Sequence, residues 1–217
     1  MRINKFLAQA TGLSRRAADR IISDGRVLVN NQRASLGGEV KPTDSVTLNG
    51  RGLQLPKKTI TIMLNKPVGY VCSRDGQGSK TIYDLLPSQL HSLKPVGRLD
   101  KDSSGLLLLT NDGALAHQLT HPSFAKEKTY KVRLNRVLDA SDRSKIESGV
   151  HLDDGLSKLS LTGERTNLVA RLHEGRNRQI RRTFAALGYD VKSLHRTNFG
   201  PYEIKDLKAG EYLTLVP

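Results

Sequence analysis

Residues 95–113 read PVGRLDKDSSGLLLLTNDG, and this stretch joins a buried strand to a dense group of charges. Residues 106–110 form a continuous apolar run between a glycine and the turn sequence NDG, which predicts a strand buried on both faces. Arg98 and Asp100 stand just before it, separated by a single leucine. By composition alone, this segment is an aspartate-rich turn that leads into a strand.

The segments around this strand predict the rest of a larger domain. Alternating apolar residues predict strands over 60–64, 130–134 and 168–172. Helices are predicted over 114–119, 141–146 and 177–187. Strands outnumber helices and no regular β-α-β alternation is visible, so we expect an α+β domain around a mostly antiparallel sheet.

The N-terminal segment predicts a smaller domain with two helices. The apolar side of the first is Ile3, Phe6, Leu7 and Ala10, which recur at helical spacing. Ser14 is suited to cap the second, whose apolar side is Ala17, Ala18, Ile21 and Ile22. Strands are expected at 27–29 and 46–48.

Domain boundaries follow from the residues after this segment. The sequence RGLQLPKK at 51–58 combines glycine, proline and three basic residues, which is typical of a linker. We therefore predict a small domain over 1–50, a linker over 51–58 and a larger domain over 59–217.

The charge of the chain is far from balanced. Its 217 residues include 35 lysines and arginines against 21 aspartates and glutamates, a formal net charge of +14. A fold does not require this imbalance, which fits a polyanionic partner such as nucleic acid or an anionic membrane surface.

Several classes of protein are excluded or disfavoured. A single cysteine, Cys72, excludes an internal disulfide framework. No apolar run approaches the roughly 20 residues of a membrane span, and the N-terminus lacks a signal-peptide pattern, so we expect a cytoplasmic protein. His117 and His121 lie one helical turn apart, but Gln118 stands where a zinc protease has glutamate, and we expect no metal site.

A second basic segment, EGRNRQIRR at 174–182, opens the helix predicted over 177–187. Arg178 and Arg182 project from the side opposite its apolar stripe, and Arg181 lies between. Positive charges beside the positive end of a helix are unfavourable unless anionic groups sit there. The pattern therefore favours a phosphate, a carboxylate or both at this site.

The run SRRAADRIISDGRVLVNNQRA at 14–34 resembles the S4-like RNA-binding domain, and the resemblance covers roughly residues 1–48. Asn31 stands where glycine is usual, and asparagine tolerates the positive φ of such a turn. The resemblance implies phosphate contacts from Arg15, Arg16, Arg20 and Arg26.

Four further segments together resemble the bacterial ribosomal RNA pseudouridine synthases, in the branch that carries an S4-like domain in front. They are NKPVGYVCS at 65–73, the segment 95–113, the stretch His121–Tyr130 and EGRNRQIRR. The resemblance implies isomerisation of a uridine: uracil leaves C1′, rotates and rejoins through C5. It implies neither a metal nor another cofactor.

The resemblance also implies roles for single residues. Asp100 matches the catalytic carboxylate, with Arg181 as its basic partner and Arg178 as the second choice. Tyr130 matches the tyrosine that stacks on the flipped base, and Leu194 an apolar wall, although both also suit an ordinary core. Arg98 matches a residue that reaches toward the RNA. Further phosphate contacts are expected from Lys66, Lys80, Lys126, Lys128, Arg176, Arg182 and Arg196.

Two alternatives stay open at this point. A catalytically idle RNA-binding or ribosome-assembly factor would share the basic domain but would not need Asp100. A membrane-surface protein would need a basic amphipathic helix with a large exposed apolar side, which the apolar stripes here do not offer. We expect a monomer that acts on structured ribosomal RNA, and the sequence does not mark the target uridine.

Overall fold

The computed structural model describes residues 1–56 and 58–215. Lys57, in the expected linker, and Val216 and Pro217, at the end of the expected larger domain, lie outside the described residues. The chain divides into two compact units, Met1–Thr59 and Ile60–Pro217. Each unit is described by itself.

Two helices of the first unit form as the sequence predicts. They are α1 (Ile3–Thr11) and α2 (Arg15–Ser23), and the Ser14 side chain accepts a hydrogen bond from the amide of Ala17 at the start of α2. The apolar faces of both helices meet in one core that includes Ile3, Leu7, Ala18 and Ile22. Arg15, Arg16, Arg20 and Arg26 are exposed.

A small antiparallel sheet completes this unit, in the order β2-β1-β3-β4. Its strands are β1 (Val27–Val29), β2 (Gln32–Arg33), β3 (Val46–Leu48) and β4 (Arg51–Gly52). Asn30 and Asn31 have φ of 50° and 64° in the turn between β1 and β2, as expected for asparagine in place of glycine. The expected linker is wrong at its start, because Arg51 and Gly52 pair with β3.

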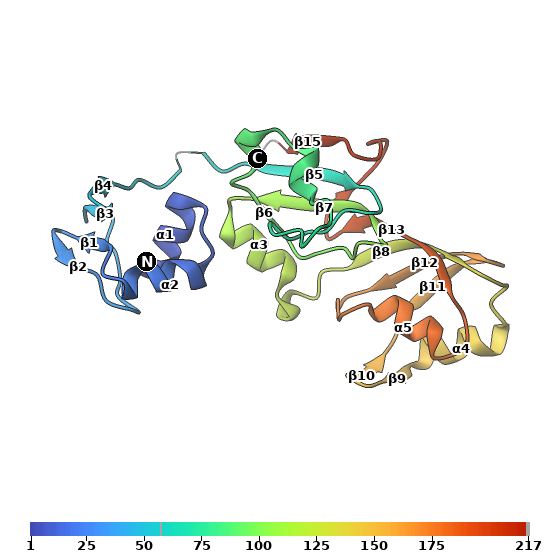
Figure 1. Ribbon diagram of the computed structural model, residues 1–217. Coiled ribbons are helices and arrows are strands. Elements are labelled where there is room, and N and C mark those ends of the chain that lie inside the picture. Colours follow the sequence, from blue (N-terminus) through green and yellow to red (C-terminus); the bar gives the residue numbers. More distant parts are fainter. Residues whose placement is uncertain (57, 216–217) are drawn as a thin grey trace. The chain divides into compact units, whose positions relative to one another are not determined.

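The second unit is built on a nine-stranded sheet among the described residues. Its main order is β11-β12-β8-β13-β7-β5-β15, with β14 beside β13 and β6 beside β7 (Figure 1). The strands are β5 (Thr61–Lys66), β6 (Lys94–Pro95), β7 (Ser104–Thr110), β8 (Lys128–Leu134), β11 (Ser160–Glu164), β12 (Asn167–Leu172), β13 (Val191–Phe199), β14 (Tyr202–Glu203) and β15 (Tyr212–Leu215). Pairing is antiparallel except between β13 and β7, which confirms the α+β class.

Strand β7 lies inside the sheet and is buried on both faces, as its sequence predicts. Leu106 to Leu109 are all fully buried. Because side chains alternate along a strand, Leu107 and Leu109 join one apolar cluster, whereas Leu106 and Leu108 join another. This strand therefore holds two cores together and fixes the turn of Arg98 and Asp100 at its start.

Strand β13 is the main element that the periodicity analysis missed. It pairs antiparallel with β8 and parallel with β7, so it lies near the centre of the sheet. Its sequence, VKSLHRTNF, contains lysine, histidine and arginine, and does not resemble a buried strand. The charged side chain of Arg196 is nevertheless buried on it, which composition alone does not reveal.

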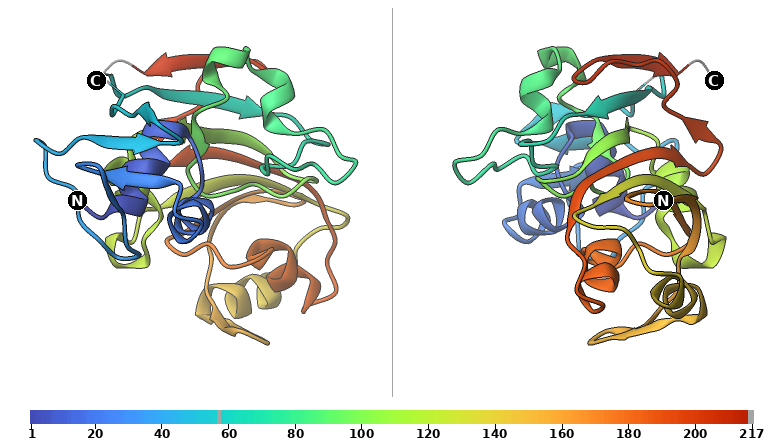
Figure 2. Two further views of the ribbon diagram at one scale, coloured as in Figure 1. Left: turned by 60° about the vertical axis from the view of Figure 1, so that its left-hand side comes forward. Right: turned by 90° about the vertical axis from the view of Figure 1, so that its right-hand side faces the viewer.

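Helices of the second unit occur at the three predicted places. They are α3 (Gly113–Thr120), α4 (Ala140–Ser148) and α5 (Gln179–Ala185). Short 3-10 turns occur at η1 (Ile82–Leu85), η2 (Ser88–Leu90) and η3 (Pro122–Phe124). A hairpin of β9 (Val150–Leu152) and β10 (Gly155–Ser157) lies near α4 and α5 (Figures 1 and 2).

Helix α5 begins later than the sequence predicts. Arg178 has φ of 47° and ψ of 30°, so it precedes the helix in a left-handed conformation. The predicted start at Asn177 is therefore wrong by two residues, and Arg178 belongs to the loop before α5. None of the helices among the described residues is both long and apolar enough to cross a membrane.

A close approach between strands β7 and β13 provides a stability test at Gly105. It has φ of +109°, and a Cβ built on it would lie 2.2 Å from the backbone oxygen of Arg196 on β13. We expect Gly105→Ala to lower the free energy of unfolding by about 3 kcal/mol or more. Gly113→Ala is the matched control, because a Cβ at Gly113 meets no heavy atom within 4 Å.

The control should change stability by no more than about 1 kcal/mol, in the stabilising direction, because Gly113 opens helix α3. Urea unfolding of both variants measures the two effects. Equal stability of the two variants would contradict the close packing of β7 against β13.

Candidate functional site

A cleft of about 680 Å³ opens in the second unit beside the turn that carries Asp100. It is lined by the residues before β7, the end of α3, strands β8 and β13, and the loop before α5. Of the residues singled out from the sequence, the lining includes Arg98, Asp100, Lys126, Lys128, Tyr130, Arg176, Arg178, Leu194 and Arg196. Segments far apart in the sequence are thus brought to one site.

Asp100 faces two positive side chains. Arg98 Nη2 lies 3.5 Å from one carboxylate oxygen, and Arg178 Nη1 lies 3.7 Å from the other. The Asp100 side chain is 21% exposed, so it is accessible from the cleft but largely shielded from bulk water. Such shielding strengthens Coulomb interactions between the carboxylate and charges around it.

Arg181, which the resemblance implied as the basic partner of Asp100, makes its direct contacts with Val191 and Asp102. Its guanidinium donates to the backbone oxygens of Val191 and Asp102, both at 2.7 Å, and its Nε lies 3.2 Å from a carboxylate oxygen of Asp102. It therefore ties the turn before β7 to the start of β13. Arg178, the second choice, is the arginine of this segment at ion-pair distance from Asp100.

Asp102 is a site residue that the sequence analysis did not name. It forms a bidentate pair with Arg178, with both nitrogen–oxygen distances at 3.0 Å. This pair holds the Arg178 guanidinium between two carboxylates. A signal was present in the sequence, because Asp102 lies two residues after Asp100 in the same turn.

Lys66 is fully buried, so the prediction that it contacts a phosphate is wrong. Its ammonium donates to the backbone oxygens of Pro67 at 3.0 Å, Asp100 at 3.0 Å and Ser103 at 2.7 Å. Burial lowers the pKa of Lys66 from its ordinary value. Its three hydrogen bonds shape the turn that presents Asp100.

Arg196 is also buried, and the prediction of a phosphate contact fails for the same reason. Its Nε donates to the backbone oxygen of Leu106 at 2.8 Å, and its guanidinium lies over the Phe199 ring, 4.9 Å from the centroid. Arg196 thus packs under the cleft as part of its floor.

Tyr130 and Leu194 are buried residues that border the cleft. They come from the neighbouring strands β8 and β13, and both belong to the main apolar cluster of the unit. Ile180 of α5 joins them in the cleft lining. The cleft beside Asp100 therefore has an apolar wall, which suits the flat face of a base.

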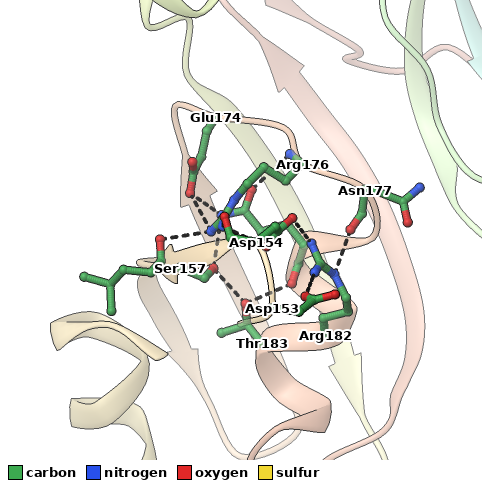
Figure 3. Close-up of polar contacts among 10 residues, drawn as sticks. Asp153, Asp154, Ser157, Glu174, Arg176, Asn177, Arg182 and Thr183 are labelled. Carbon is green, nitrogen blue, oxygen red and sulfur yellow. Dashed lines mark hydrogen bonds and ion pairs between the residues drawn. The ribbon is translucent and has the colours of Figure 1, made fainter. Parts of the chain in front are cut away.

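Arg176 and Arg182 are engaged in a polar network with the β9–β10 hairpin (Figure 3). Arg176 Nη1 lies 2.8 Å from Asp154, and Arg182 Nη2 lies 2.6 Å from the other oxygen of the same carboxylate. Arg182 also pairs with Asp153, and Arg176 with Glu174. These contacts join the hairpin to helix α5 and to the loop before it.

The acid-sensitive pair of Asp102 with Arg178 provides a test of this geometry. Hydrogen bonds from Arg178, with the charge of Arg181, lower the pKa of the Asp102 carboxyl below its ordinary value. A carboxylate with a lowered folded-state pKa contributes stability that is full above the unfolded pKa of about 3.9 and is lost as pH falls through the folded value.

We therefore expect Asp102→Asn to destabilise the protein by a constant amount between neutral pH and about pH 5, and by progressively less below about pH 4. Denaturant unfolding at several pH values measures the difference. Asp206→Asn, which removes an exposed carboxylate outside the cleft lining, should show no comparable loss. A cost for Asp102→Asn that does not change with pH would contradict the ion pair.

Comparisons with known proteins identify the family to which the chain belongs. Residues 60–186 match the model of the RNA pseudouridylate synthase family, and residues 1–46 match the S4 domain. The chain is 37% identical to an uncharacterized RNA pseudouridine synthase of Aquifex aeolicus, over 99% of this chain and 90% of the relative.

Two further relatives have names that state a substrate. Ribosomal large subunit pseudouridine synthase B of Bacillus subtilis is 34% identical over 100% of this chain and 92% of its own length. Ribosomal small subunit pseudouridine synthase A of Vibrio vulnificus is 36% identical over 98% and 94%.

A solved structure described as a pseudouridylate synthase superposes with a TM-score of 0.73 at 33% identity, and covers 100% of this chain and 96% of that one. These similarities confirm the resemblance found in the sequence and extend over essentially the whole chain. The chain is therefore an enzyme of the RNA pseudouridylate synthase family, with an S4 domain at its N-terminal end.

Proposed function

We propose that this enzyme isomerises a uridine of ribosomal RNA to pseudouridine, with Asp100 as the catalytic carboxylate. The observation that carries the proposal is the position of Asp100. It lies in a cleft between Arg98 and Arg178, next to an apolar wall that includes Tyr130 and Leu194.

The reaction makes clear demands on such a site. The bond from C1′ to N1 of uracil breaks, the base rotates, and a bond from C1′ to C5 forms while C5 loses a proton and N1 takes one up. The composition of the nucleotide is therefore unchanged, so the reaction is neither an oxidation nor a hydrolysis. The carboxylate can act by addition to C1′, by addition to C6 or through a glycal, and each route needs it within reach of the target nucleotide.

The apolar wall suits a base that has left its stack. Protein enzymes that act on a base in RNA extrude the nucleotide and hold the base against aromatic or apolar side chains. Tyr130 and Leu194, on adjacent strands, offer such a surface within the same cleft as Asp100. Their positions in the rigid core of the sheet would hold the base in one orientation.

Ribosomal RNA is proposed as the substrate for two reasons. The relatives from Bacillus subtilis and Vibrio vulnificus carry ribosomal names, one for the large and one for the small subunit, and both names support ribosomal RNA as the class of substrate. The net charge of +14 also fits a polyanion. This substrate implies a cytoplasmic location.

The S4 domain supplies the proposed docking contacts. Arg15, Arg16, Arg20 and Arg26 are exposed there, so their charges are available to phosphates. In the second unit, Lys126, Lys128 and Arg98 line the cleft. Carboxylates of the β9–β10 hairpin already pair with Arg176 and Arg182, so we propose no phosphate contact from these two arginines.

The proposal is tested by release of tritium from unmodified ribosomal RNA transcripts that carry uridine labelled at C5. Formation of the new bond expels this hydrogen, so release reports the isomerisation directly. We expect Asp100→Asn to lower the rate by roughly three orders of magnitude or more while RNA affinity stays within a few-fold.

Asp206→Asn serves as the matched control, since it makes the same carboxylate-to-amide change outside the cleft. It should keep the wild-type rate. Release that survives in Asp100→Asn would eliminate this residue as the essential carboxylate. Salt-sensitive RNA binding without release by the wild type would instead favour an idle RNA-binding factor.

A further inference from the structure

An exposed group of aromatic rings lies at the junction of α3 and η3. His117, His121 and Phe124 form it, with ring centroids 4.7 Å apart for the two histidines, 5.8 Å for His117 and Phe124, and 6.3 Å for His121 and Phe124. We refer to these three residues as the ring corner. Both histidines are exposed, and Phe124 is 44% exposed.

Phe124 differs from the other phenylalanines of this chain. Phe6, Phe184 and Phe199 are at most 8% exposed, as expected for large apolar side chains in a folded protein. An exposed cluster of rings in this position is therefore unexplained by the packing of the core. Exposed apolar groups rimmed by polar residues commonly mark binding surfaces.

Local hydrogen bonds hold the ring corner in place. The Nδ1 of His121 accepts from the amide of Ser123 at 3.3 Å and lies 2.8 Å from its hydroxyl oxygen. Ala125, which follows Phe124, has φ of 41°, and its carbonyl accepts from Nδ1 of His173 at 2.9 Å. The turn is thus tied to the loop that runs on to Arg178.

The ring corner borders the cleft that contains Asp100. His121 lines this cleft together with its neighbours Thr120 and Pro122. The same cleft is lined by Asp100 and Tyr130, where the target base is proposed to sit. An RNA strand that places one base against Tyr130 can therefore continue past the ring corner.

Two lysines that follow the ring corner in the sequence also line the cleft. Lys126 and Lys128 line it, and the Lys128 ammonium donates to backbone oxygens of Lys126 at 3.2 Å and His173 at 3.3 Å. Burial and the charge of Arg196 lower the pKa of Lys128. Aromatic rings beside lysines along a groove are the combination that binds single-stranded nucleic acid.

We propose that the ring corner stacks an unpaired base of the RNA substrate that neighbours the target uridine. The inference rests on the proposed function, because it needs the RNA strand to enter the Asp100 cleft. Stacking on phenylalanine and histidine faces accepts any base, so this contact adds affinity and position without fixing the sequence. A base stacked on the ring corner would keep the RNA strand unpaired next to the flipped target uridine.

The experiment compares wild type with Phe124→Ala, Phe124→Tyr and the control Val137→Ala. Val137 is 48% exposed and is not part of the cleft lining, so its loss removes a similarly exposed apolar side chain elsewhere. Each variant is assayed by tritium release from ribosomal RNA transcripts labelled at C5 of uridine. Thermal unfolding checks that all of them fold.

We expect Phe124→Ala to lower kcat/KM by roughly 5- to 100-fold, mainly through KM, because one stacked base is lost. Phe124→Tyr retains the ring and should recover most of the activity, and Val137→Ala should match the wild type. Unchanged KM in Phe124→Ala, or an equal loss in Phe124→Tyr, would overturn the ring corner as a stacking site. The second result would indicate a role in packing or in contact with a protein.

A readout independent of activity separates this proposal from the proposed function. Ribosomal RNA transcripts that contain 4-thiouridine are irradiated with the wild-type protein, and cross-linked peptides are identified by mass spectrometry. Adducts at His117, His121 or Phe124 support stacking even if the wild type releases no tritium, an outcome that would refute only the proposed reaction. Tritium release without any adduct in this segment would overturn the ring corner and leave the proposed function intact.

Discussion

The ammonium of Lys66 is the constraint around which the site is built. Lys66 is the last residue of strand β5, and its buried ammonium donates to the backbone oxygens of Pro67, Asp100 and Ser103. Removing a charge from water is costly unless its hydrogen bonds are satisfied, and three carbonyls satisfy this one. The turn from Asp100 to Ser103 must therefore curl around the ammonium, which directs the Asp100 side chain into the cleft.

The arginines of the segment 174–182 form two groups of ion pairs. Asp102 holds Arg178 and Arg181 beside the turn, and Arg178 reaches from there toward Asp100. Farther out, Asp153 and Asp154 hold Arg176 and Arg182. Many arginines of this segment are thus structural, whereas Arg15, Arg16, Arg20 and Arg26 of the S4 domain are exposed and Lys126 and Lys128 line the cleft. Net charge alone does not distinguish these roles.

The spacing of apolar residues predicted the helices and strands whose buried side chains recur at regular intervals. The leucines of β7 and the helices of the first unit are examples, because each buries one or both faces in register. Strand β13 was missed because its buried residues include the charged Arg196, which contacts the backbone of β7 and the ring of Phe199. The prediction that Lys66 contacts a phosphate was wrong for a similar reason, because its charge is buried against backbone oxygens of a distant segment. Asp102 and the left-handed Arg178 depend on contacts between segments about 76 residues apart, which no local pattern contains.

Hydrogen exchange of the Asp100 turn tests the constraint most directly. In the wild type, the amide of Ser103 donates to Asp100 and the amide of Gly69 donates to Lys101, so both should exchange slowly. In Lys66→Met, we predict much faster exchange in peptides spanning 67–71 and 97–105, with unchanged exchange in helices α1 and α2 of the other unit. Equal protection of both peptides in wild type and variant would show that the turn holds its shape without the buried ammonium, and would contradict the account.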